Sequence, residues 1–235
     1  MAVPVNNSDL VIVNHTWRSL SRTISWVRLW FLEIRPLFLV GSFGLAFLGT
    51  SVAWWDGFLS LDFALLAFFG LLLWHISVNV LNEYFDYRDG IDFYTVKSLF
   101  HGGSGNLPSQ LLKARSVLRL GLFCFVLAIP IWIYLVIATG LALLPIVLLG
   151  AVCVLFYTQV LTKWRLAEVS SAVGIGVLPV MAFYFVQTGE YTLNIYAAAI
   201  SSGLLLFGFH LLAELPDAEA DTIGGRKTLP IILGR

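Results

Sequence analysis

Two short segments of the sequence concentrate acidic side chains in a pattern that suits metal chemistry. Their carboxylates recur within seven residues in the first segment and within five in the second: Asp86, Asp89 and Asp92, then Asp217, Glu219 and Asp221. If the two groups converge, mutual repulsion opposes ionisation unless cations are bound. Carboxylates without Cys ligands or a His cluster suit the hard ion Mg²⁺, which bridges protein carboxylates to substrate phosphates. The pattern therefore predicts a magnesium site that binds a phosphorylated substrate.

Each acidic segment continues a polar stripe with helical spacing. The steps between the polar residues are four, three and four in both stripes: His75, Asn79, Asn82 and Asp86 in one, and His210, Glu214, Asp217 and Asp221 in the other. Residues at these steps share one helical face. Polar side chains in membrane helices are costly and point into the protein or a water-filled cavity, so we expect both stripes to line one cavity open to the cytoplasm. Taken singly, the two histidines are expected to be hydrogen-bonded within the bundle and not to bind a ligand.

Basic side chains accompany the acidic ones. They are Arg88, Lys97, Lys163, Arg226 and Lys227. Acidic groups alone suit a bare cation, whereas acidic groups with Mg²⁺ and nearby Lys and Arg suit a diphosphate. One at a time, each basic residue is better explained as a signal of membrane topology. Their position beside the carboxylates favours a diphosphate site.

The elements that position these residues are predicted to be membrane-spanning helices. The 235 residues are 59% hydrophobic and only 12% charged, which indicates lipid as the solvent. Six runs approach the roughly 20 apolar residues that a spanning helix needs: Pro36 to Trp54, Leu61 to Leu81, Val117 to Thr139, Leu141 to Tyr157, Val169 to Thr188 and Leu193 to Ala213. Spans in lipid must satisfy their own amide groups, and the apolarity does not alternate as in a barrel. We predict an all-α, polytopic transmembrane bundle without a cleaved signal peptide.

The distribution of positive charge gives this bundle an orientation. All fourteen Lys and Arg residues lie before the first span, between the second and third or in the first turn of the third (Arg119), after the fourth or after the sixth. By the positive-inside rule, the N-terminus and both acidic segments face the cytoplasm of a bacterial or archaeal cell membrane. Nothing in the charge pattern indicates nucleic-acid binding. Cys124 and Cys153 fall inside spans, so no disulfide is expected.

The chain divides into three parts along its length. Residues 1–16 are polar and without periodicity, and we expect a tail. Residues 17–35 place apolar side chains at steps of three and four, which predicts an amphipathic helix on the cytoplasmic leaflet. Residues 36–235 form the transmembrane domain. Glu168, at the start of the fifth span, has a helix-dipole explanation, with acceptor binding as the alternative.

Both acidic segments resemble the paired motifs of the UbiA superfamily of membrane prenyltransferases. The first motif is Asn-Glu-Tyr-Phe-Asp-Tyr-Arg-Asp-Gly-Ile-Asp at 82–92, and the second is Asp-Ala-Glu-Ala-Asp-Thr-Ile-Gly-Gly-Arg-Lys-Thr-Leu at 217–229. Within that family, the Asp-Tyr-x-x-Gly-x-Asp form and the following Gly-Gly-Ser-Gly are most similar to 1,4-dihydroxy-2-naphthoate polyprenyltransferases of menaquinone biosynthesis. Arg35-Pro36 and Phe156-Tyr157-Thr158 with Lys163 also resemble family positions. The similarity runs from about Trp26 to the last residue.

The resemblance implies a role for each set of residues. The Mg²⁺ ligands would be Asp86, Asp92, Asp217 and Asp221, with Asp89 as an alternative in the first motif and Asn82 as support. The diphosphate contacts would be Lys97, Lys163 and Arg226. Tyr157 would lie near the reacting carbon. The sequence departs from the family pattern at Ala213, where relatives often place Asn, and it ends as a seventh span begins, so we expect a C-terminally incomplete domain.

The function expected from the resemblance is electrophilic aromatic alkylation. A prenyl group would pass from a polyprenyl diphosphate, held by Mg²⁺, to an aromatic acceptor in the lipid bilayer, with 1,4-dihydroxy-2-naphthoate as the implied acceptor. One alternative is a UbiA-type enzyme with a different acceptor. Another is a cation transporter with an acid-lined cavity, which predicts polar residues continuing outward, whereas the third and fourth spans hold almost none. A third is a scaffold without catalysis, which polar stripes in a membrane disfavour.

Overall fold

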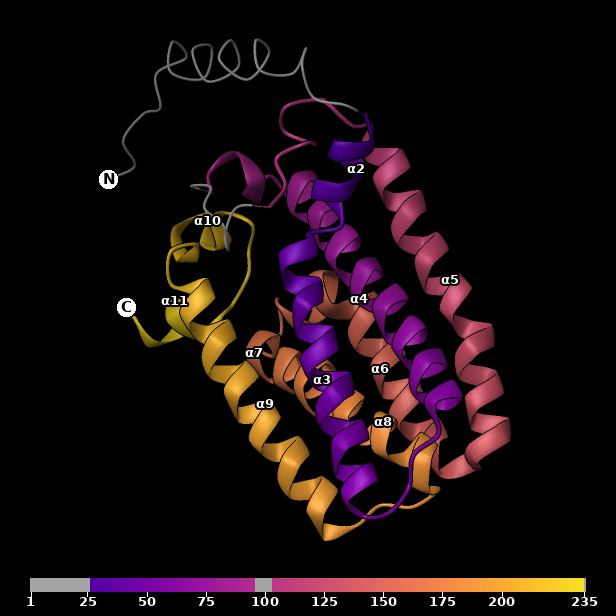
Figure 1. Ribbon diagram of the computed structural model, residues 1–235. Coiled ribbons are helices and arrows are strands. Elements are labelled where there is room, and N and C mark those ends of the chain that lie inside the picture. Colours follow the sequence, from indigo (N-terminus) through magenta and orange to yellow (C-terminus); the bar gives the residue numbers. More distant parts are fainter. Residues whose placement is uncertain (1–25, 96–102, 235) are drawn as a thin grey trace, which may run out of the picture.

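The chain folds as a bundle of long helices, seen in a computed structural model that describes residues 26–95 and 103–234 (Figure 1). Over these ranges every regular element is helical. The long helices are α3 (Pro36–Trp55), α4 (Leu61–Asp89), α5 (Ala114–Thr139), α6 (Leu144–Phe156), α8 (Leu178–Thr188) and α9 (Leu193–Glu214). The all-α class predicted from the sequence is confirmed.

Six helical segments are long and apolar enough to cross a membrane. They are Pro36–Trp55, Leu61–Asp89, Ala114–Thr139, Leu141–Leu161, Ala167–Thr188 and Leu193–Glu214. These match the six runs read from the sequence, with one notable difference. The second helix continues past Leu81 to Asp89, because the polar residues of the first motif keep the helical spacing. The first acidic motif therefore begins on a rigid helix and not on a loop.

Shorter elements gather at one end of the bundle, beside the first turn of α3 and the last turn of α4 (Figure 1). They are α2 (Trp26–Glu33), η2 (Ile91–Phe93), α10 (Ala218–Ile223) and α11 (Leu229–Leu233). The described part of the predicted amphipathic helix is α2. The rest of that helix and the predicted tail, residues 1–25, lie outside the described residues.

The outer faces of the long helices carry large apolar side chains. On α9, Ile200, Leu204, Leu205 and Leu212 are all exposed. A soluble monomer rarely leaves so extended an apolar surface in water. These faces suit contact with lipid. Cys124 and Cys153 are free cysteines, as expected from the sequence.

The bundle interior is built around α4, which packs along α5. Trp74 stacks on Phe125 with ring centroids 5.7 Å apart, and its indole Nε1 donates to the Phe125 carbonyl at 3.3 Å. The Ser77 hydroxyl donates to the Gly121 carbonyl at 2.8 Å, where the helices run close together. These contacts fix the rotation of α4, so its polar stripe faces away from α5.

A sharp break separates α2 from α3, and α4 holds it in place. Arg35 adopts a left-handed conformation (φ 54°), followed by Pro36 in the first turn of α3. Asn79 on α4 donates to the Ile34 carbonyl at 3.2 Å. Arg35 donates from Nη1 to the Asn82 side chain at 3.3 Å. A non-glycine residue in this region is strained and needs such surrounding contacts to persist.

Two π-helical stretches interrupt the fourth and fifth spans. They are η4 (Tyr157–Leu161), which follows α6, and η5 (Ala172–Val177), which lies between α7 (Ala167–Ser171) and α8. Stretches of π-helix are rare and occur frequently at functional sites. Tyr157 in η4 and Gly174 in η5 both line the cavity described below.

The η5 stretch touches α9 through glycines. A Cβ added at Gly176 would lie 2.7 Å from the Gly203 Cα and 3.2 Å from the Ser202 carbonyl oxygen. Small residues at helix crossings allow backbones to approach closely in membrane proteins. Because the obstructing atoms belong to the backbone, α9 would have to move to admit even one methyl group.

We therefore expect Gly176→Ala to destabilise the fold by about 1–3 kcal/mol, the usual cost of overpacking. The measurement is the midpoint of thermal unfolding of the detergent-purified protein. Gly208→Ala on α9 is the matched control, because a Cβ there meets nothing within 4 Å. Equal melting temperatures for the two variants would contradict the close approach of η5 and α9.

Candidate active site

A cavity of about 580 Å³ lies between α3, α4, α9 and the two π-helical stretches. All members of the two polar stripes line it: His75, Asn79, Asn82 and Asp86 from α4, and His210, Glu214, Asp217 and Asp221 from α9 and the segment after it. The prediction that the stripes share one cavity is confirmed. Its volume is in the range that holds a small-molecule ligand.

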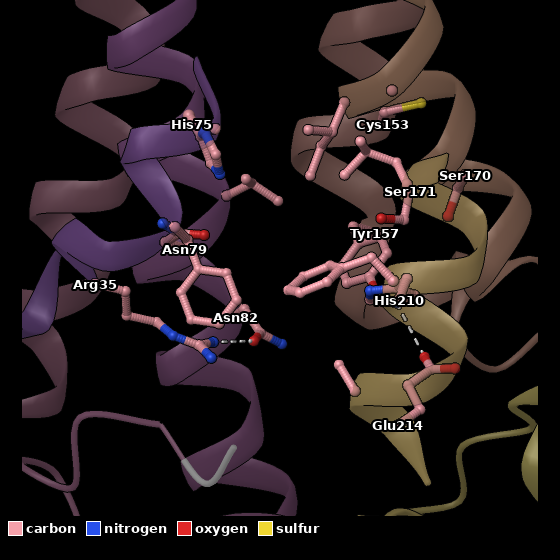
Figure 2. Close-up of a pocket in the computed structure, with 18 of the residues that line it drawn as sticks. Arg35, His75, Asn79, Asn82, Cys153, Tyr157, Ser170, Ser171, His210 and Glu214 are labelled. Carbon is pink, nitrogen blue, oxygen red and sulfur yellow. Dashed lines mark hydrogen bonds and ion pairs between the residues drawn. The ribbon is translucent and has the colours of Figure 1, made fainter. Parts of the chain in front are cut away.

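The cavity has two facing walls (Figure 2). Arg35, Asn79 and Asn82 lie on one wall, opposite Tyr157 and His210 on the other. Beyond the polar residues the lining becomes apolar, with Leu45, Leu48, Val154, Ile175 and Leu206. The cavity therefore joins a polar, charged end to an apolar end.

The two acidic motifs meet through one arginine. Arg226 donates from Nη1 to Asp221 at 2.9 Å, and from Nη2 to Asp86. Its side chain is only 13% exposed, and that of Asp221 is 2% exposed. Both carboxylates and the guanidinium line the cavity, together with Asp92 and Asp217. The Gly-Gly-Arg turn within the second motif thus joins α4 to α10.

Burial and neighbouring charges shift the pKa values of Asp221 and Arg226. Burial raises the pKa of Asp221 to about 6; Asp86 and Asp217 raise it as well, while Arg226 opposes them. Burial alone would lower the pKa of Arg226, but Asp86 and Asp221 raise it above its ordinary value. The guanidinium is therefore always charged. The carboxylates need a cation beside them to remain ionised.

Asn82 orients Asp86 within this arrangement. Its amide nitrogen Nδ2 donates to Asp86 at 3.1 Å and to the Thr158 hydroxyl at 3.2 Å, while its oxygen accepts from Arg35. Both amide hydrogens are used, so the side chain has one preferred orientation. This geometry agrees with the supporting role implied by the resemblance.

The carboxylates suit Mg²⁺ that is bound together with substrate phosphates. Among the described residues, no three His, Cys, Asp or Glu side chains are close enough to form a metal cage. Four aspartates nevertheless face the same cavity: Asp86, Asp92, Asp217 and Asp221. Mg²⁺ is commonly bound by one or two carboxylates, with waters and substrate phosphates completing its shell. The donor set therefore suits Mg²⁺ that arrives with a diphosphate.

Two predicted site residues lie away from the cavity, and a third lies outside the described residues. Lys163 donates to Asp89 at 2.8 Å, and Asp89 also accepts from Arg88 at 2.9 Å. Neither Lys163 nor Asp89 is among the residues that line the cavity. Lys97 lies outside the described residues. Asp89 thus pairs with Arg88 and Lys163 outside the cavity, whereas Asp86 and Asp92 face the cavity.

Tyr157 contacts the second stripe on the same wall of the cavity. Its hydroxyl lies 2.6 Å from His210 Nε2, and the same nitrogen lies 3.0 Å from Glu214 Oε1. The other histidine, His75, is hydrogen-bonded to the Ser42 hydroxyl at 2.7 Å. The expectation that both histidines are hydrogen-bonded within the bundle is confirmed.

Glu168 has a wider role than its position in the first turn of α7 indicates. It is fully buried, and its Oε1 accepts the backbone N–H of Leu229. The Lys227 N–H donates to the Thr162 carbonyl at 2.9 Å. The tail of the second motif is thus attached to η4 and α7, which a helix-dipole argument alone does not reveal.

The sequence arguments did not assign Arg35, Ser170 or Ser171 to the site, although all three line the cavity. Arg35 lies 3.7 Å from the buried Glu83 carboxylate as well as beside Asn82. In the sequence, the only indication that Arg35 belongs to the site was the resemblance of the Arg35-Pro36 pair to family positions. The serines are short and adjacent to each other, so they give no periodic signal.

The described part of the glycine-rich segment is attached to the site by two buried glutamates. The Ser104 N–H donates to Glu83 at 2.9 Å, and the Ser104 hydroxyl lies 2.8 Å from Glu33 and 2.9 Å from Glu83. Asn106 also donates to Glu33 at 2.8 Å. Gly103 lines the cavity as a result. This segment forms part of the polar end.

Comparisons with known proteins agree with this geometry. The model of the UbiA prenyltransferase family matches residues 42–235. The 1,4-dihydroxy-2-naphthoate octaprenyltransferase of Bacillus subtilis (strain 168) is 30% identical over 203 residues, which are 85% of this chain and 64% of that protein. The protein of the same name from Escherichia coli (strain K12) is 27% identical over 93% of this chain and 71% of that protein. The chain thus spans slightly less than two thirds of the Bacillus protein.

Solved structures share the fold. A UbiA homolog from Archaeoglobus fulgidus bound to DMAPP and Mg²⁺ superposes with a TM-score of 0.64 at 17% identity, over 86% of this chain and 69% of that one. The same homolog bound to GPP and Mg²⁺ gives a TM-score of 0.63 at 18% identity, with the same coverage.

The pairing of Arg226 gives a measurable expectation. Removing one partner of a buried ion pair costs about 3–5 kcal/mol, because the other charge stays buried and uncompensated. We expect Arg226→Gln to lower the unfolding midpoint strongly, and added Mg²⁺ to restore more of it than Mg²⁺ adds to the parent protein. Arg119→Gln is the matched control, since Arg119 is exposed on α5. Equal Mg²⁺ effects on Arg226→Gln and the parent would contradict a cation site at these carboxylates.

Proposed function

The chain belongs to the UbiA prenyltransferase family, and from that premise we propose that it transfers a prenyl group from a polyprenyl diphosphate to an aromatic acceptor within the membrane. The observation that carries the proposal is the meeting of both acidic motifs, through Arg226, at the polar end of a cavity whose other end is apolar. A prenyl diphosphate has the same division into a charged head and an apolar chain.

The diphosphate half of the substrate is assigned to the charged end. Asp86, Asp92, Asp217 and Asp221 would hold Mg²⁺, with Asp89 as the alternative in the first motif. Bound Mg²⁺ neutralises the charge that develops on the departing diphosphate. The two Archaeoglobus structures, solved with Mg²⁺ and prenyl diphosphates, support the same class of ligand.

The basic residues would complete the diphosphate site. Arg226 now donates to two carboxylates, and its forked donors match phosphate oxygens equally well. Binding of Mg²⁺ at the carboxylates would release it to the phosphates. Lys163 would do the same by leaving Asp89, and Lys97 remains a proposed contact. Donors fixed before the reaction stabilise the departing charge without further reorganisation.

The reacting carbon is assigned to the middle of the cavity. Tyr157 lies between the charged end and the apolar end, and the aromatic rings of Phe38 and Phe209 also line the space. Aromatic faces attract cations, so these rings would stabilise an allylic cation as the C–O bond breaks. The apolar residues beyond would surround the prenyl chain.

The proposed acceptor is 1,4-dihydroxy-2-naphthoate, as in menaquinone biosynthesis. Its support is the name shared by the relatives from Bacillus subtilis and Escherichia coli, at 30% and 27% identity. The same family premise admits another aromatic acceptor. The apolar end of the cavity disfavours the alternative of a cation transporter, because a permeating ion needs polar groups along its whole path.

We also propose a multi-pass location in the cell membrane with the acidic motifs on the cytoplasmic side. The support is the distribution of Lys and Arg, all of which lie on the motif side of the six spans.

The activity can be tested directly. Purified protein in lipid or detergent, incubated with Mg²⁺, labelled geranyl diphosphate and 1,4-dihydroxy-2-naphthoate, is expected to yield a prenylated naphthoquinol precursor, and chelation by EDTA to abolish the product. Asp86→Asn is expected to lower the rate by more than about 100-fold, since even indirect supporters of a metal typically contribute 10- to 100-fold.

Asp62→Asn is the matched control, because Asp62 is exposed at the opposite end of the same helix. The absence of product with any aromatic acceptor, together with unchanged diphosphate binding by Asp86→Asn, would overturn the proposed function.

A further inference from the structure

Four side chains from three elements form a continuous polar chain at the cavity wall. The Tyr157 hydroxyl, from η4, lies 2.6 Å from His210 Nε2, and this nitrogen lies 3.0 Å from Glu214 Oε1 on α9. The carboxyl of Glu168, on α7, adjoins that of Glu214. Tyr157, His210 and Glu214 all line the cavity, on the wall opposite Arg35 and Asn82 (Figure 2).

The far end of this chain is buried and incompletely paired. Glu168 is fully buried and Glu214 is 9% exposed, and the second carboxyl oxygen (Oε2) of each has no hydrogen-bond partner among the described residues. Buried carboxyl oxygens rarely go without a partner in folded proteins. Two adjoining carboxyl groups repel each other when both are charged.

The proposed function assigns none of these side chains to the diphosphate. The function proposed above assigns the diphosphate to Arg226 and the aspartates of the two motifs, whereas Tyr157 and His210 lie on the wall opposite Arg35 and Asn82 (Figure 2). The Tyr157 hydroxyl and the Glu214 carboxyl group both lie at Nε2 of His210, so this nitrogen can take a proton from the tyrosine and then donate a hydrogen bond to the carboxyl group. The proposed alkylation needs such a group, because the acceptor must lose a proton as its ring becomes nucleophilic.

We propose that Tyr157, His210 and Glu214 bind the hydroxyl of a phenol- or naphthol-class acceptor and take its proton, an inference that rests on the function proposed above. Tyr157 would touch the acceptor, His210 would receive the proton, and Glu214 with Glu168 would be positioning residues that stabilise the charged imidazole. A hydroxyl donor suits this acidic wall, where an acceptor carboxylate would be repelled.

The proposed step balances in protons and electrons. The acceptor O–H passes its proton to the Tyr157 oxygen while the Tyr157 proton moves to His210 Nε2. The ring carbon forms the new C–C bond to the allylic carbon, and the C–O bond breaks with its electron pair leaving on the diphosphate. The ketone formed regains aromaticity when the substituted carbon loses its hydrogen as a proton to the diphosphate and the oxygen recovers its proton from His210.

Other charged groups surround the proton relay formed by Tyr157, His210 and Glu214. Glu168 from α7 and Asp221 from α10 are acidic, whereas Arg226 and Arg35 are basic. Glu214 lies 3.0 Å from His210 Nε2. We therefore expect its removal to disturb the relay more than removal of a more distant charge.

The experiment compares His210→Asn and Glu214→Gln with the parent protein in two measurements. The first is the turnover number with Mg²⁺, geranyl diphosphate and 1,4-dihydroxy-2-naphthoate between neutral and alkaline pH. The second is the dissociation constant for Mg²⁺ and geranyl diphosphate without acceptor. We expect a loss of about 100-fold in turnover at neutral pH, in line with general acid–base catalysis, with unchanged diphosphate binding. The loss should shrink at alkaline pH, where the acceptor hydroxyl ionises in solution.

Glu190→Gln is the matched control, because Glu190 is exposed in the loop before α9. Full turnover by His210→Asn and Glu214→Gln would overturn the relay, as would a loss of the same size at every pH. Weakened diphosphate binding by both variants would also overturn it, by assigning these residues to the diphosphate site. If the parent forms no product with any acceptor, the proposed function fails, and the relay that rests on it fails with it.

Discussion

The cost of holding like charges inside an apolar bundle governs this structure. Asp86 and Asp221 come from segments far apart in the sequence, and both are buried against Arg226. In a medium of low polarity, none of the three groups is tolerated alone. The end of α4 and the turn after α10 must therefore come together. Their junction creates one charged end for the cavity.

The remaining elements are arranged around that junction. Asn82 links Asp86 to Thr158 of η4, and Glu168 attaches α7 to the tail of the second motif. The π-helical turns matter here because a widened turn changes the direction in which a side chain projects. Tyr157, the first residue of η4, meets His210 on the same wall of the cavity. In the proposed reaction, diphosphate chemistry and proton transfer would therefore occupy different parts of one cavity.

Much of the fold followed from local patterns. Apolar run length identified the six spans, because each helix must satisfy its own amide groups in lipid. Helical spacing placed His75, Asn79, Asn82 and Asp86 on one face, and the second stripe likewise, because the helical repeat depends on the backbone alone. The end of α4 was set too early, at Leu81, since the boundary was drawn from hydropathy and the polar motif remains helical to Asp89.

By itself, the sequence determined the membrane-spanning helices, their polar stripes and the acidic chemistry at one end, since all of these are encoded in composition and short-range spacing. Only the tertiary structure decided which charges neutralise each other. Arg226 joins Asp86 to Asp221, while Lys163 is taken by Asp89, although all of these residues looked equivalent in the sequence. Arg35 and Glu168 also acquire their partners only through folding. Pairing between buried charges depends on distance and direction in three dimensions, and residue spacing fixes these only within a single helix.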